Sequence, residues 1–148
     1  MFEEHTPVYI SGTKGPILFC LHGLGLSAMS FAVLARELKD YLTLITFDWK
    51  GHGDSTQPIN SDLSEQVLIN EALEVLNFVS NHEKFHDRSL IICGHSMGGA
   101  IASKLVTYLS KSTEDVELYK KIKSIFVIDV VEGTALEALP MMEMIVKS

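Results

Sequence analysis

The sequence lacks the long apolar runs of a membrane protein and the basic clusters of a nucleic-acid-binding protein. Its longest apolar runs, such as Ile17 to Leu21 and Ile125 to Ile128, have the length of strands, whereas a membrane-spanning helix needs about 20 apolar residues. The acidic start, Met1 to Glu4, has no feature of a secretory signal. Because 12 Lys and Arg stand against 19 Asp and Glu, with no basic cluster, we expect neither a membrane nor a nucleic acid as partner.

Cysteine is also scarce, and its positions bear on the state of the thiols and on the cellular compartment. The two cysteines, Cys20 and Cys93, lie inside apolar runs, so we predict free buried thiols and a cytoplasmic or nuclear location. An apolar content of 47% and a charged content of 21% are typical of a globular chain rather than a disordered one. The length of 148 residues predicts a single domain over residues 1–148.

Strand-like and helix-like segments alternate along the chain. We expect an opening hairpin of two strands, followed by helix, strand, helix, strand, helix and strand, over residues 8–10, 16–21, 28–39, 43–47, 63–79, 89–93, 98–109 and 124–130. The basic stretch from Lys120 to Lys123 is expected at a helix end that leads into a strand. This order predicts an α/β fold with a mostly parallel sheet and helices on both faces. The apolar runs Leu90 to Cys93 and Ile125 to Ile128 predict strands buried on both faces.

The stretch from Gly94 to Gly98 has the pattern G-x-S-x-G between a predicted strand and a predicted helix. In that setting a serine lies on a sharp strand-to-helix turn with its hydroxyl exposed in a cleft. Side chains at 94 and 98 would clash across such a turn. We therefore interpret Ser96 as a nucleophile, with the backbone N–H of Met97 as one donor of an oxyanion hole. The alternative is a glycine-rich helix start with a capping serine.

Two further loops follow predicted strands. His22 to Gly25 can aim a second backbone N–H at the same oxyanion, that of Leu24 or, less favoured, of Gly25, while His22 itself is interpreted as a structural histidine bonded to backbone. Asp48 to Ser55 is interpreted as a structural loop, in which neither His52 nor Ser55 has an obvious partner.

Asp129 ends the last predicted strand, at the edge of the sheet where Ser96 also lies. A carboxylate at this position can orient and stabilise a protonated histidine. From the residues alone, capping of the following turn is an equally good interpretation.

Together these motifs resemble the α/β-hydrolase superfamily. The stretch from Val127 to Ala135 resembles the segment that carries the triad acid in the protein phosphatase methylesterases, and the similarity runs from about residue 8 to residue 142. The resemblance implies that Ser96 is the nucleophile and Asp129 the acid. It also implies hydrolysis of the methyl ester on the C-terminal leucine of the protein phosphatase 2A catalytic subunit, without a metal or an organic cofactor.

One element of that family is missing from these residues. In this superfamily the histidine follows the acid, but all the histidines, namely His5, His22, His52, His82, His86 and His95, precede Asp129. We expect none of them to replace the base, and the ring of His95 to point away from the Ser96 hydroxyl. We interpret the chain as an N-terminal part that lacks the C-terminal strands and lid, with an apolar edge left open at 124–130 and little or no activity on its own.

Two other functions remain open. The first is another serine hydrolase of the same fold, a lipase or esterase, which would have no reason to share the stretch from Val130 to Ala135. The second is a non-catalytic remnant that still binds the phosphatase.

Overall fold

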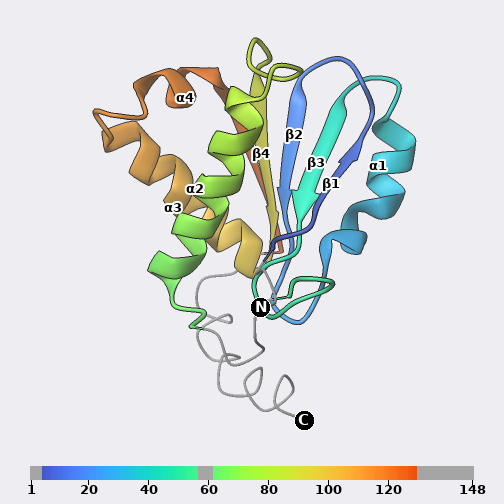
Figure 1. The fold of residues 1–148 in the computed structure, drawn as a ribbon, viewed down its shortest axis with the longest axis vertical. Coiled ribbons are helices and arrows are strands. Elements are labelled where there is room, and N and C mark those ends of the chain that lie inside the picture. The colour runs from blue at the N-terminus through green and yellow to red at the C-terminus, as the bar shows by residue number, and fades with distance from the viewer. Residues whose placement is uncertain (1–4, 57–61, 130–148) are drawn as a thin grey trace.

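Strands from distant parts of the chain form one sheet, in the order β1-β3-β2-β4-β5. The structure, a computed structural model, describes residues 5–56 and 62–129. The strands are β1 (Val8–Ser11), β2 (Ile17–Leu21), β3 (Thr43–Phe47), β4 (Leu90–His95) and β5 (Ile122–Ile128). All neighbouring pairs run parallel except β1 and β3. The predicted α/β architecture with a mostly parallel sheet is therefore confirmed (Figure 1).

The predicted hairpin of the first two strands is wrong. β1 pairs antiparallel with β3, and β3 lies between β1 and β2. The turn that follows β1 packs against the chain entering β3: a Cβ on Gly15 would lie 2.0 Å from the Tyr41 carbonyl oxygen. Every residue of β3 is buried, whereas β1 is only partly covered. The fully buried β3 thus takes the interior position, and the edge falls to β1.

Helices cover both faces of the sheet, as predicted (Figure 1). A 3-10 turn, η1 (Ala28–Phe31), and a short helix, α1 (Ala32–Leu38), replace the single helix expected over 28–39 and lie on one face. Helices α2 (Glu65–Asn81), α3 (Met97–Lys111) and α4 (Val116–Lys121) lie on the other. Helix α4 adds one helix to the predicted order of elements, and its end at Lys121 and the start of β5 at Ile122 confirm the helix-to-strand junction expected there.

The sheet separates a large apolar core from a small one. The large core lies under α2 and α3 and includes Phe19, Trp49 and Leu105. The small core lies on the opposite face, below η1 and α1, and holds both cysteines. Both thiols are free and buried, as predicted. None of the helices in residues 5–56 and 62–129 is long and apolar enough to cross a membrane.

The prediction that β5 is buried on both faces is wrong. Ile125, Phe126, Val127 and Ile128 are 39%, 56%, 44% and 47% exposed. β5 is the last strand of the described sheet and has β4 as its one strand neighbour there. Apolar composition cannot distinguish this edge position from an interior one. The exposed edge agrees with the open apolar edge expected at this end of the sheet.

Candidate active site

Ser96 is the single residue between the end of β4 at His95 and the start of α3 at Met97. Its backbone has φ 53° and ψ −120°, a conformation that a residue with a side chain adopts at a cost of about 1–3 kcal/mol. Ser96 is only half-buried, and it precedes a 15-residue helix whose N-terminal end favours negative charge. The predicted strand-to-helix turn is therefore present, with Ser96 at its strained centre.

Glycines permit this turn because backbone fills the space where side chains would be. A Cβ on Gly94 would lie 2.2 Å from the Gly98 carbonyl oxygen, and a Cβ on Gly98 would lie 2.1 Å from that of Leu21. Contacts this short require the backbone to move. The predicted clash across the turn is confirmed, and the second contact brings the start of α3 against the end of β2.

The loop after β2 reaches Ser96 directly. A Cβ on Gly23 would lie 3.2 Å from the Cβ of Ser96. The next residue, Leu24, has a backbone N–H with no acceptor in residues 5–56 and 62–129, whereas the N–H of Gly25 donates to His52 Nε2 at 3.0 Å. Because Met97 is the first residue of α3, its N–H has no partner within the helix. The backbone N–H groups of Leu24 and Met97 thus remain available to bind an oxyanion, whereas that of Gly25 is already bonded to His52.

Asp129 lies beside Ser96 because β5 continues the register of β4. His95 is opposite Ile128, and the Ser96 N–H donates to the Ile128 carbonyl at 2.9 Å. Asp129 follows with φ 55° and a side chain that is 79% exposed. Its Oδ2 is 3.9 Å from His95 Nε2, a contact that the sequence did not indicate. The structure therefore brings residues 96 and 129 together at the C-terminal ends of β4 and β5. The role of Asp129 as the acid stays a prediction.

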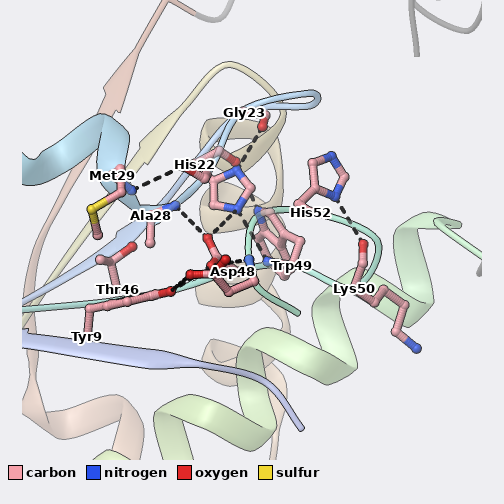
Figure 2. Close-up of polar contacts among 12 residues, drawn as sticks. Tyr9, His22, Gly23, Ala28, Met29, Thr46, Asp48, Trp49, Lys50 and His52 are labelled. Atoms are coloured by element: carbon pink, nitrogen blue, oxygen red, sulfur yellow. Dashed lines mark hydrogen bonds and ion pairs between the residues drawn. The ribbon is translucent and has the colours of Figure 1, made fainter. Parts of the chain in front are cut away.

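His22 is fully buried and is bonded to backbone, as expected of a structural histidine. Its Nδ1 donates to the Gly23 carbonyl at 2.8 Å, and its Nε2 accepts the Trp49 N–H at 3.2 Å (Figure 2). Burial lowers the pKa of His22 to about 4, although the hydrogen bond to Gly23 opposes the shift. The imidazole is therefore neutral at pH 7, and both of its nitrogens are engaged.

His52 is bonded in the same way, so the expectation that it has no obvious partner is wrong. Its Nδ1 donates to the Lys50 carbonyl at 3.0 Å, and its Nε2 accepts the Gly25 N–H. This bond ties the loop after β3 to the loop after β2. Ser55, in contrast, has a buried hydroxyl with no hydrogen-bond partner among the described residues. Within the same part of the chain, no hydrogen bond joins a histidine to the Ser96 hydroxyl.

Asp48 holds these loops in place, a role that the sequence did not indicate. The carboxylate is buried and accepts the Ala28 N–H at 2.7 Å, the Tyr9 hydroxyl at 3.0 Å and the Asp54 N–H at 3.0 Å (Figure 2). Gly53 is required beside it, since a Cβ there would lie 2.3 Å from the carboxylate. Burial and the hydrogen bonds to Asp48 and Asp54 raise the pKa of Tyr9 to about 12. The loop is structural, as predicted, and Asp48 joins three separate segments.

Comparison with known proteins agrees with this geometry. The family model described as the alpha/beta hydrolase fold matches residues 16–137, and the chain belongs to that family. Among solved structures, a marine microorganism esterase superposes with a TM-score of 0.69 at 25% identity, over 94% of this chain and 49% of that one. A carboxyl esterase from Bacillus coagulans has a TM-score of 0.71 at 15% identity, over 98% of this chain and 47% of that one, and shows the fold alone.

Within the family, the chain resembles protein phosphatase methylesterase 1. The probable protein phosphatase methylesterase 1 of Caenorhabditis elegans is 36% identical over 134 residues, which cover 89% of this chain and 34% of that protein. Protein phosphatase methylesterase 1 of Bos taurus is 36% identical over 138 residues, covering 92% and 33%. The chain thus spans about a third of the length of these curated relatives.

Proposed function

We propose that this chain is part of a serine carboxylesterase of the protein phosphatase methylesterase type. Its substrate would be the methyl ester on the C-terminal leucine of the protein phosphatase 2A catalytic subunit. The observation that carries the proposal is the strained backbone of Ser96, placed between a parallel strand and the N-terminus of α3. The resemblance to methylesterases at 36% identity supports the choice of ester.

The chemistry assigns one role to each group at the C-terminal ends of β2, β4 and β5. The Ser96 hydroxyl attacks the ester carbonyl, and a base takes its proton. The N–H groups of Leu24 and Met97 hold the oxyanion, each contributing on the order of 10²–10³ in rate. Methanol leaves with the proton from the base, and water then releases the free carboxylate. Asp129 orients the base and stabilises its protonated form.

The base itself lies outside these 148 residues in this proposal. His22 and His52 are buried and bonded to backbone through both ring nitrogens, while His95 lies toward Asp129. Loss of a triad member lowers the rate by roughly 10⁴–10⁶. The 148-residue chain alone is therefore expected to show little or no turnover.

A chimera tests the proposal most directly. Residues 5–135 of this chain replace the matching stretch of the Bos taurus relative, and methanol release is measured from a peptide that ends in leucine methyl ester. We expect hydrolysis that Ser96→Ala abolishes. The matched control is Ser103→Ala, an exposed serine on the same helix, which should keep the activity.

Other outcomes separate the alternatives. A folded chimera that cleaves p-nitrophenyl acetate but not the peptide ester would favour a general lipase or esterase. A folded chimera that binds the phosphatase and cleaves neither ester would favour the non-catalytic binding protein. If residues 1–148 alone turned over an ester in a manner dependent on Ser96, the base would lie within them and that part of the proposal would be wrong.

A further inference from the structure

The two cysteines of the sequence lie side by side on neighbouring strands. Cys20 of β2 and Cys93 of β4 are direct partners in the parallel register. Adjacent strands lie about 4.7–4.9 Å apart, and disulfides join residues whose Cα atoms are about 4.4–6.8 Å apart. Since residues 1–148 contain 2 cysteines, any disulfide formed within these residues must join this pair.

The thiols also lie in the same environment. Both belong to the small apolar core with Leu18, Phe31 and Leu44, on the face covered by η1 and α1. As register partners on adjacent strands, the two side chains leave the sheet on the same face. The pair therefore requires only a small approach of two adjacent side chains to form a bond, and no rearrangement of the sheet.

The Cys20 S–H donates to the Leu18 carbonyl oxygen at 3.9 Å. The thiolate is the reactive form of cysteine, and either sulfur of the pair can attack first.

The cover over the pair is thin. Helix α1 has 7 residues, none of them buried, and packs Ala35 and Leu38 against this core, while η1 adds the buried Phe31. A cavity of about 190 Å³ on the same face is lined by Phe31 and Leu44 of the core and by neither cysteine. Elements with few buried contacts open locally at low cost. Local opening of this cover would give a small oxidant access to thiols that are 0% and 3% exposed in the folded chain.

We propose that Cys20 and Cys93 are a redox-sensitive pair that closes into a reversible disulfide on reaction with a hydroperoxide. One of the two thiolates attacks the peroxide, the O–O bond breaks, and a sulfenic acid forms with release of hydroxide. The sulfur of the other cysteine then attacks the sulfenic sulfur and displaces water. In total, two thiols and one hydrogen peroxide give one disulfide and two waters, and a dithiol reductant reverses the reaction.

The bond would join β2 and β4 just below the candidate active site. Cys20 precedes His22 by two residues, Cys93 precedes Ser96 by three, and the next register pair is Leu21 with Gly94. The disulfide would therefore tie the two strands that lead into the predicted oxyanion-hole loop and the strained turn. Its formation does not depend on the proposed function.

Intact-mass spectrometry of residues 1–148 tests the proposal. The reduced protein is treated with hydrogen peroxide in native buffer, free thiols are alkylated, and the mass is measured. We expect a loss of two hydrogen atoms, no alkylation, a cross-linked 20–93 peptide on non-reducing digestion, and full reversal by dithiothreitol. The rate should not depend on protein concentration, because the partners are in one molecule.

Variants separate this pair from general oxidation. With a sulfenic-acid trap, Cys20→Ala and Cys93→Ala should each be labelled at the remaining cysteine, because neither variant has a second thiol to close the disulfide, whereas the unsubstituted protein should lose the label as the disulfide forms. Absence of label in both variants would overturn the sulfenic-acid step. Addition of oxygen without loss of hydrogen, cross-linking between molecules, or closure seen only after unfolding in urea would overturn the pair itself.

Discussion

The buried imidazole of His22 makes the stability of the chain depend on pH below 7. Burial lowers the pKa of His22 from 6.5 to about 4 in the folded state. Between these values the unfolded chain binds the proton and the folded chain does not, so protonation favours unfolding. Stability is full above pH 6.5 and falls as the pH decreases toward 4. From pH 7 to pH 5 the loss is about 2 kcal/mol, and by pH 4 about 3 kcal/mol.

Urea unfolding at several pH values measures this effect. The single tryptophan, Trp49, is fully buried and its ring lies 6.2 Å from that of His22, so its fluorescence reports unfolding, with circular dichroism as an independent signal. The comparison is with His22→Gln, which removes the titration. Burial raises the pKa of Glu71 and gives an opposite pH dependence, but Glu71 is present in both proteins and cancels from the difference.

The expected result is a wild type that loses about 2 kcal/mol more than His22→Gln between pH 7 and pH 5. The variant is less stable at pH 7 as well, because it loses the packing against Trp49, but this offset does not affect the slope. His86→Gln, on an exposed side chain, controls for loss of a surface imidazole and should keep the wild-type slope. Equal slopes for wild type and His22→Gln would refute the neutral buried histidine.

Three further substitutions test the site. Ser96→Gly should be more stable in urea than Ser96→Ala by about 1–2 kcal/mol, because glycine tolerates φ 53° and alanine does not; an alanine variant of equal stability would contradict the strain. Gly98→Ala should lose at least about 3 kcal/mol, because its Cβ meets the Leu21 carbonyl oxygen at 2.1 Å, and a loss below about 1 kcal/mol would contradict the close approach. Asp48→Asn should cost about 2–3 kcal/mol, because an amide cannot accept all three hydrogen bonds, whereas the exposed Asp40→Asn should stay within about 0.5 kcal/mol.

The order of elements was predictable because each depends on a local pattern. Apolar runs predicted β2, β3 and β4, and helical spacing predicted α2 and α3. Pairing was not predictable in the same way. The turn after β1 has the glycines of a hairpin, but its partner is set by burial, and β3 is 32 residues farther along the chain than the end of β1. The exposure of β5 likewise depends on its neighbours and not on its own residues.

The candidate site shows the same division between features set by local sequence and features set by long-range contacts. Ser96, Gly94 and Gly98 lie in one short motif, so their geometry could be predicted from local sequence. The side chains that hold the loops of the site in place could not be predicted in this way. Asp48 accepts hydrogen bonds from Tyr9 and Ala28, which lie 39 and 20 residues away, and no local spacing signals such partners. His52 accepts a hydrogen bond from the Gly25 N–H, which lies 27 residues away.

The register of β2 and β4 connects these observations. It places Leu21 opposite Gly94, so the loops that follow the two strands start at the same level of the sheet. Gly98 then allows α3 to approach the end of β2, and Gly23 allows the first loop to approach Ser96. One step earlier, the same register sets Cys20 against Cys93. A shift of one residue would therefore separate the thiols and also move Gly23 away from Ser96, so the glycines and the cysteine pair depend on a single alignment of two strands.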